Sequence, residues 1–208
     1  MLITFSTPQG GARCTGWFIN KNTIATAGHC VHRGSGGSGG FYSVGSYRIY
    51  PGYNGNFAPY GVCSAKRLST VNGWANTGLD DYDYGAIKLA TACNTKGNTT
   101  GWYGYTTNVA LNRTTTINGY PGDKPFTQWK STDKVTVLQT RRVFYKNDTV
   151  GGMSGSAVVA PGPTCPANCA VAIHAYGTYG SAPFNTNNHG TRITSQVFNN
   201  LTAWKNAA

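Results

Sequence analysis

The apolar segments of this chain are short, and turn-forming residues interrupt them at modest intervals. The sequence has 208 residues, of which 28 are Gly and only 11% are charged. A composition rich in Gly, Ser, Thr, Asn and Tyr disfavours long helices and favours short strands joined by tight turns. No apolar run approaches the roughly 20 residues that a membrane-spanning helix needs. The chain is therefore expected to be an all-β protein, with one large domain or two small ones.

Strand candidates follow one another along the chain. Residues 15–19 and 23–27 flank the polar turn 20–22 and predict a hairpin. The Gly- and Ser-rich segment 33–40 is interpreted as a mobile surface loop, after which strand-like sequence resumes at 41–44. Further candidates lie at 84–90, 114–118, 134–139, 156–160 and 170–176. This pattern is typical of a β-sandwich or a pair of β-barrels. The polar segment 94–101 indicates a boundary between two halves, residues 1–100 and 101–208.

One segment departs from the β pattern. Val197, Leu201 and Trp204 recur at helical spacing, and Thr194 or Ser195 can cap the start of a helix. The sequence therefore predicts a C-terminal amphipathic helix within 194–205 that packs against the β core.

The cysteines indicate the compartment. An even number in a weakly charged, Gly-rich chain favours three disulfides and an oxidising environment. The zinc alternative is weak because the chain has no C-x-x-C pair, and neither a metal nor a cofactor is expected. The first five residues lack the features of a signal peptide, so the chain is interpreted as a mature secreted form whose leader has been removed rather than a cytoplasmic protein. The six cysteines are Cys14, Cys30, Cys63, Cys93, Cys165 and Cys169.

The charge is strongly basic. Seventeen basic and six acidic residues give a formal charge of +11. The basic residues are dispersed, with Lys66-Arg67 and Arg141-Arg142 as the densest groups, and no nucleic-acid-binding signature accompanies them. The charge is therefore interpreted as a solvated surface, with no nucleic-acid or membrane partner.

Three local patterns contain candidate catalytic residues. His29 lies beside Cys30 just after an apolar strand candidate, and Asp83 opens another. Ser154 has glycines on both sides, which permits a tight turn and leaves the amides of Gly152 and Ser154 free for a developing oxyanion. Taken singly, the His29 pattern also fits an ordinary surface or core histidine, the Asp83 pattern an acidic turn, and the Ser154 pattern a Gly-rich hairpin turn.

The order of these residues discriminates between mechanisms. All six acidic residues lie between His32 and Ser154. The α/β-hydrolase order of Ser, acid, His and the subtilisin order of acid, His, Ser are therefore both excluded for this nucleophile. The remaining order is His29, Asp83, Ser154, in which His29 is the general base and Asp83 orients it.

These blocks resemble a known family. Residues 26–30, 83–89 and 152–156 are similar to the three motif blocks of chymotrypsin-like serine proteases. More narrowly, the chain resembles the bacterial glutamyl endopeptidases of the bacillary type, also at 14–17, 119–124, 173–174 and 190–205. The resemblance covers nearly the whole chain. It implies two antiparallel β-barrels with the site between them, secretion, a monomer, and polypeptide substrates cleaved after acidic residues, chiefly Glu.

The resemblance also assigns a specificity pocket. Thr149 and His174 match pocket positions of glutamyl endopeptidases, and Gly177 would leave the pocket mouth open. A hydroxyl and an imidazole can donate hydrogen bonds to a carboxylate, and a protonated imidazole adds charge. The alternative for His174 is a buried structural histidine. Asp148 suggests a rival, trypsin-like specificity for Arg or Lys. His32 and His189 match no motif and are expected at the surface.

The remaining implications concern the bridges and the departures from the family. The resemblance implies disulfides Cys14–Cys30 and Cys165–Cys169, which leaves Cys63–Cys93. Met153 and Ala157 replace residues that are usually polar and Pro, respectively, and the family has additional mature residues at the N-terminus. These departures keep open a second interpretation, an inactive homologue that acts as a binding protein.

The chain contains no Glu beside its six Asp. A chain of this length ordinarily carries about ten Glu. A protease that cleaves after Glu is exposed to its own active site, so the absence is interpreted as protection against autolysis. The alternative is compositional drift toward Asn, Ser and Thr.

Overall fold

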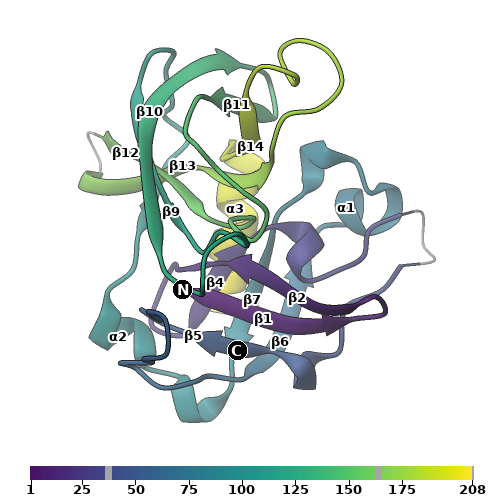
Figure 1. Cartoon of the computed structure of the whole chain (residues 1–208), viewed down its shortest axis with the longest axis vertical. Coiled ribbons are helices and arrows are strands. Elements are labelled where there is room, and N and C mark those ends of the chain that lie inside the picture. Colours follow the sequence, from purple (N-terminus) through teal and green to yellow (C-terminus); the bar gives the residue numbers. More distant parts are fainter. Residues whose placement is uncertain (36–38, 163–164, 208) are drawn as a thin grey trace.

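The chain is folded into two β-rich halves. The computed structural model describes residues 1–35, 39–162 and 165–207, without the side chains of 162 and 165–168. Strands β1–β7 form the lower half in Figure 1 and strands β8–β14 the upper half, with helix α3 behind them. The predicted mobile loop 33–40 and the predicted Cys165–Cys169 bridge both include parts of the chain outside the described residues.

The first half consists of two antiparallel sheets. One has the strand order β2-β1-β5 and the other the order β3-β4-β7-β6. The predicted hairpin is β3–β4, and the Asn20 side chain closes its turn by accepting hydrogen bonds from the amides of Asn22 (3.0 Å) and Thr23 (2.7 Å). The strands are β1 Leu2–Thr7, β2 Gly10–Thr15, β3 Trp17–Phe18, β4 Thr23–Thr26, β5 Arg48–Tyr50, β6 Ala65–Thr70 and β7 Gly85–Leu89.

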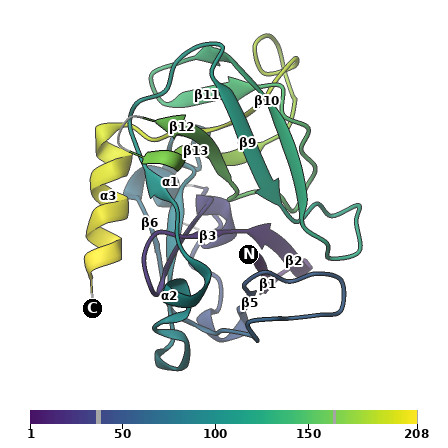
Figure 2. The ribbon, with the colours of Figure 1, turned by 90° about the vertical axis from the view of Figure 1, so that its left-hand side faces the viewer.

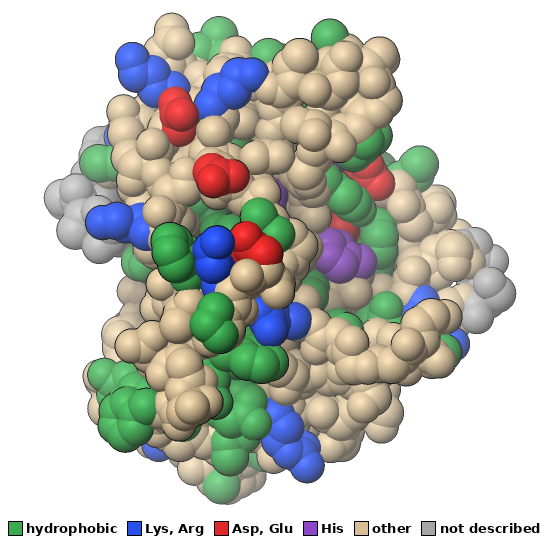
Figure 3. All heavy atoms as spheres, viewed as in Figure 1, with side chains coloured by type: hydrophobic (Ala, Val, Ile, Leu, Met, Phe, Trp, Pro, Cys, Tyr) green, Lys and Arg blue, Asp and Glu red, His purple; other side chains and the backbone are tan. Residues whose placement is uncertain are grey.

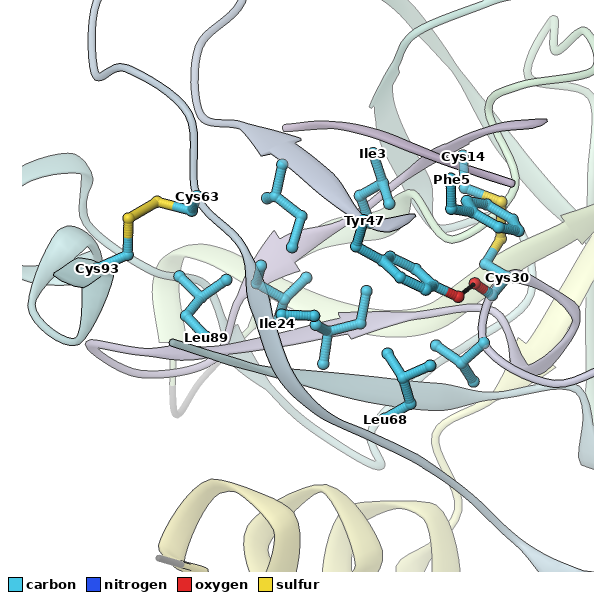
Figure 4. Close-up of a cluster of buried hydrophobic side chains, with 14 of the residues drawn as sticks. Ile3, Phe5, Cys14, Ile24, Cys30, Tyr47, Cys63, Leu68, Leu89 and Cys93 are labelled. Carbon is cyan, nitrogen blue, oxygen red and sulfur yellow. Dashed lines mark hydrogen bonds between the residues drawn. A yellow bond between two sulfur atoms is a disulfide. The ribbon is translucent and has the colours of Figure 1, made fainter. Parts of the chain in front are cut away.

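The two sheets enclose one apolar core, which Figure 4 shows. The Tyr47 ring lies in its centre and its hydroxyl donates a 2.8 Å hydrogen bond to the carbonyl of Cys30. The structure has the disulfides Cys14–Cys30 and Cys63–Cys93, the two pairs expected within this half. The first of these ties β2 to the turn that follows β4, which matters for the site below.

The second half is a closed barrel. Strands β12, β9, β10, β11, β14 and β13 hydrogen-bond in this order, and a pairing of β12 with β13 closes the ring. In strand β9, for example, the side chains alternate between buried and more exposed positions, and those of Thr115 and Ile117 are buried. The short β8 joins β13 in parallel. The strands are β8 Gly104–Tyr105, β9 Thr114–Gly119, β10 Trp129–Leu138, β11 Arg142–Tyr145, β12 Ala157–Gly162, β13 Cys165–Tyr176 and β14 Asn188–Arg192.

The predicted C-terminal helix is present as α3, Ser195–Asn206. The Thr194 hydroxyl caps it by accepting from the amide of Val197 at 3.4 Å. Val197 and Leu201 pack in a core that also contains Trp17 of the first half and Ile173 of the second. Figure 2 shows α3 running along one side of the molecule. The helix thereby joins the two halves through their shared apolar core.

The other helical segments are short. They are α1 Asn72–Thr77, α2 Lys96–Thr100 and the 3-10 turns η1 Gly28–Cys30, η2 Val44–Ser46, η3 Asp80–Tyr82 and η4 Thr91–Cys93. Among the described helices, none has the length and apolar character that crossing a bilayer requires.

The segment 41–44 is not the strand that the sequence predicted. Phe41 forms an isolated bridge with His32, and the turn η2 begins at Val44. His32 is also buried, at 7% exposure, because its ring packs edge-on against Phe41 and its Nδ1 accepts from the amide of Gly34 at 3.0 Å. The expectation that His32 lies at the surface is therefore wrong.

Candidate active site

Adjacent strands bring His29 and Asp83 together. Strand β4 pairs antiparallel with β7, with Thr26 opposite Gly85, so the turn η1 after β4 meets the turn η3 before β7. His29 Nδ1 lies 2.6 Å from Asp83 Oδ2, and the His29 amide donates to Oδ1 at 2.7 Å. Close packing requires Gly28 here, since a Cβ would lie 2.9 Å from Asp83 Oδ1. Two hydrogen bonds therefore fix the imidazole relative to one carboxylate.

The carboxylate of Asp83 favours the protonated form of His29. Asp83 is fully buried, whereas 30% of the His29 side chain is exposed. Figure 3 shows histidine atoms in a hollow between the two halves. Burial lowers the pKa of His29, but the charge and hydrogen bond of Asp83 outweigh it, so the pKa is raised above 6.5. With its Nδ1 proton bound by Asp83, the neutral imidazole presents Nε2 as an acceptor.

The turn at Ser154 is clamped between the two halves. The Ser154 carbonyl accepts from the amide of Thr15 at 2.8 Å, and the Gly155 amide donates to His174 O at 2.7 Å. Gly155 has a φ of +88°, and a Cβ there would overlap the Thr15 carbonyl and the Thr26 hydroxyl. The chain therefore needs glycine at 155 to seat the serine against the strand that leads to His29.

The Ser154 hydroxyl donates to the carbonyl of Ala175 at 3.3 Å. Among the described residues, this hydroxyl forms no hydrogen bond with the ring of His29. Catalytic hydrogen bonds are often long or misaligned until substrate binds.

The amides of Gly152 and Ser154 donate no hydrogen bond to a described residue. Gly152 has a φ of +98°, and a Cβ there would lie 2.6 Å from the carbonyl of Tyr120. The Thr15 hydroxyl donates to Gly152 O at 3.0 Å and so orients the following peptide. Within the described part of the chain, neither the Gly152 amide nor the Ser154 amide has an acceptor. Both are therefore available to an oxyanion.

The predicted pocket residues His174 and Thr149 lie in different surroundings. His174, on β13, is 3% exposed, and its Nδ1 lies 2.7 Å from the Tyr145 hydroxyl. Thr149 Oγ1 is buried without a hydrogen-bond partner and lies beside a cavity of about 360 Å³ that Asp148 and Met153 also line. His174 does not line this cavity.

Gly177 directly follows β13. A Cβ there would make an ordinary van der Waals contact, 3.7 Å from Asn188 Oδ1.

His174 is neutral at physiological pH. Burial, together with the neighbouring His189 and His29, lowers its pKa to about 3. The expected contribution of positive charge is therefore corrected: His174 supplies a hydrogen-bond donor or acceptor only.

Asp148 does not share the surroundings of His174. Its side chain is exposed and lies at the cavity that Lys124 and Lys130 also line. A carboxylate in this setting is solvated and has basic neighbours, unlike a buried selector for Arg or Lys.

Sequence reasoning missed a polar cluster behind the site. His189, expected at the surface, is fully buried against the ring of Tyr176, with 5.2 Å between centroids. Its Nδ1 lies 2.8 Å from Arg142 Nη1, and burial with the Arg142 charge lowers its pKa to about 4. Arg142 also pairs with Asp80 (3.3 Å) and Asp81 (2.8 Å) of η3. The Arg141-Arg142 pair was the one sequence signal for this cluster.

One group of described side chains has the spacing of metal ligands. The donor atoms of Cys14, Cys30 and His29 lie within 4.8 Å of one another. The two sulfurs form a disulfide and the imidazole is bound to Asp83. This group therefore does not fit a metal ion.

Known proteins have similar sequences and folds. The trypsin family model matches residues 2–201. A glutamyl endopeptidase of Bacillus licheniformis is 43% identical over 94% of this chain and 60% of its own length. An extracellular metalloprotease of Bacillus subtilis is 39% identical over 93% of this chain and 58% of its own. This chain thus spans about three fifths of the length of these two relatives.

A solved structure has a similar fold. A Glu endopeptidase in complex with MPD superposes with a TM-score of 0.80 at 30% identity, covering 99% of this chain and 90% of that one. The predicted resemblance to bacterial glutamyl endopeptidases and the predicted chymotrypsin-like fold class are confirmed. The chain belongs to the trypsin family.

Proposed function

We propose that this protein is a secreted serine endopeptidase that cleaves after Glu and, less readily, after Asp. The observation that carries the proposal is the seating of the Ser154 turn against the strand that leads to the His29–Asp83 pair. A nucleophile, a base and an orienting carboxylate in this arrangement support acyl transfer.

The proposed reaction has two halves. His29 Nε2 accepts the Ser154 proton while Oγ attacks the scissile carbonyl, and the oxyanion accepts hydrogen bonds from the Gly152 and Ser154 amides. The imidazolium, stabilised by Asp83, then donates its proton to the leaving amine as the C–N bond breaks. Water, deprotonated by His29, hydrolyses the resulting Ser154 ester and restores the serine.

The preference for acidic residues draws on two side chains. Thr149 has a buried hydroxyl without a hydrogen-bond partner among the described residues. His174 has a ring nitrogen, Nε2, that forms no hydrogen bond with a described residue. Both can donate to a carboxylate, and Gly177 keeps the approach unobstructed. The names of the similar Bacillus licheniformis protein and of the superposed structure support the same preference.

The setting proposed for the enzyme is extracellular. The disulfides Cys14–Cys30 and Cys63–Cys93 favour an oxidising compartment, and one similar protein is named extracellular. We propose that residues 1–100 carry His29 and Asp83 as one domain. Residues 101–208 would then carry Ser154 and the pocket as the other, in a monomer that acts on polypeptides.

A protein-binding homologue without activity is the second candidate. The observation that favours it is the Ser154 hydroxyl, which donates to Ala175 O rather than to His29. Catalysis requires the Ser154 hydroxyl to leave Ala175 O and to donate to His29 when substrate binds.

Hydrolysis of matched peptides tests the proposal. The peptides differ only in the residue before the scissile bond, which is Glu, Asp, Gln, Leu or Arg. Wild type is expected to give the highest kcat/KM with Glu, and Ser154→Ala should retain no more than about 10³–10⁴-fold acceleration over water with an unchanged circular dichroism spectrum. Preference for Arg would make Asp148 the selector, and absence of hydrolysis would leave the binding homologue.

A further inference from the structure

The hydrogen bond between Tyr145 and His174 joins two buried side chains from different strands. Tyr145 lies on β11 and His174 on β13, with β14 between them. Gly190 of β14 pairs with His174 and has no side chain in the gap, and a Cβ there would come 2.9 Å from His174 Cα. The Tyr145 hydroxyl thereby reaches Nδ1 at 2.7 Å.

The surroundings of Tyr145 determine which atom donates. Tyr145 is fully buried in a cluster of apolar side chains such as Val135 and Val143. Its hydroxyl has no second hydrogen-bond partner among the described residues. If Nδ1 donated to the hydroxyl, the phenolic proton would be left in this apolar cluster without an acceptor, which is the costly arrangement. Burial also raises the pKa of Tyr145, which keeps the phenol protonated. The hydroxyl therefore donates and Nδ1 accepts.

The position of the imidazole proton follows. Because Nδ1 is an acceptor and His174 is neutral, the ring carries its proton on Nε2. Two backbone bonds fix the residue itself, since the His174 amide donates to Ser156 O at 2.9 Å and its carbonyl accepts from Gly155. The ring nitrogen that remains for a ligand is thus a donor.

We infer that Tyr145 is a specificity-determining positioning residue, whose hydroxyl holds His174 in the tautomer that donates from Nε2 to the carboxylate of a bound acidic side chain. The inference rests on the proposed preference for acidic residues. A carboxylate has only acceptors, so the opposite tautomer, with a lone pair on Nε2, would repel it. A carboxamide has both donors and acceptors and can bind either tautomer.

This difference gives a sharp test with Tyr145→Phe, which removes one oxygen atom. The variant frees Nδ1, so both tautomers become populated. The ratio of kcat/KM for Glu peptides over matched Gln peptides is expected to fall at least about tenfold, while kcat/KM for Leu peptides stays near the wild-type value. A loss of fold or of triad geometry would instead lower all three together.

Tyr120→Phe is the matched control. Tyr120 is equally buried, and its hydroxyl donates to Tyr53 O at 2.9 Å, away from His174. This variant loses a buried phenolic hydrogen bond of the same kind and should keep the wild-type Glu-to-Gln ratio.

The outcomes separate this inference from the proposed function. Wild type without a preference for Glu over Gln overturns both. Wild type that prefers Glu, with the same ratio in Tyr145→Phe, overturns the role of Tyr145 alone.

A second measurement does not depend on activity or on the variant. Long-range ¹H–¹⁵N correlation spectra of histidine-labelled wild-type protein distinguish the two tautomers directly. A protonated Nε2 at His174 is expected, and a protonated Nδ1 would overturn the inference.

Discussion

His29 is poised by a single carboxylate. Burial alone would hold its pKa low, and Asp83 reverses the sign through its charge and its hydrogen bond. A general base must be unprotonated, so kcat/KM should fall on the acidic side as His29 gains a proton. Because the pKa is raised, this acidic limb should lie above the ordinary histidine value of 6.5.

Asp83→Asn tests this balance. The substitution removes both influences that raise the pKa and leaves the burial that lowers it, so the acidic limb should move below 6.5. It also disturbs the tautomer, so kcat should fall by about 10⁴-fold. The measurement is the pH dependence of kcat/KM for a Glu peptide. Asp133→Asn, at an exposed residue of β10, makes the same charge change and should leave the limb in place. An unmoved limb in Asp83→Asn would contradict the role of Asp83.

The residues of the site differ in how far sequence can identify them. Gly28 and Gly155 are needed because a Cβ would clash with Asp83 and with Thr15, respectively, and these glycines make the motifs around His29 and Ser154 recognisable in one sequence. His189 is different, because its burial depends on Tyr176 and Arg142, which come from other strands. The low pKa of His174 likewise depends on packing that no local pattern encodes.

At the scale of elements, the turn η3 connects the two halves beside the site. Arg142 of β11 pairs with Asp80 and Asp81 at the start of this turn, and Asp83 follows it directly. The Thr191 hydroxyl of β14 donates to Asp83 O at 3.0 Å. The second barrel thus supports the turn that carries the orienting carboxylate of the first half.

Arg142→Met should weaken this connection. The side chain of Arg142 is 6% exposed, whereas those of Asp80 and Asp81 are 31% and 47% exposed. Solvent therefore screens the stranded carboxylates, and the expected loss of unfolding free energy is about 1–2 kcal/mol, below that of a fully buried pair. Urea unfolding measures it, and kcat should fall as the turn loosens. Arg192→Met on β14, where the described contact is to Gln139 O, is the control and should change little. Equal free energies of unfolding for the two variants would show that Arg142 does not hold the two halves together.

The strands were predictable where turn residues bound them clearly, as in β7 and β9. The start of β10 at Trp129 was missed because residues 130–134 are polar and mostly exposed, and pairing with β9 stabilises them instead. Residues 41–44 have β-forming side chains but no neighbouring strand within the described chain, and among those residues the one bridge is that of Phe41 with His32. The division of the chain at residue 100 remains a prediction.

At the scale of the whole molecule, the interpretation that the absence of Glu protects against autolysis can be tested directly. If the enzyme cleaves after Glu and tolerates Asp less well, its own surface offers only poor sites. Asn56 is exposed in the long connection between β5 and β6. Asn56→Glu, incubated concentrated, should cleave itself after the new residue, because exposed loops are preferred sites of nicking. Mass spectrometry of the fragments locates the cut.

Two controls accompany this prediction. Asn56→Gln has nearly the same shape without the charge, and Asn56→Glu combined with Ser154→Ala lacks the nucleophile. Both should stay intact. If Asn56→Glu lasts as long as Asn56→Gln while the enzyme still cleaves Glu peptides, the protective role of the missing Glu is wrong.

The central claim is that Ser154 is a nucleophile activated by His29. Covalent labelling with a fluorophosphonate, followed by mass spectrometry of the peptides, tests it most directly. We expect one adduct, on Ser154, in wild type, no adduct in Ser154→Ala, and labelling slowed by orders of magnitude in His29→Ala. Absence of an adduct from folded wild-type protein, or an adduct on another serine such as Ser156, would contradict the account.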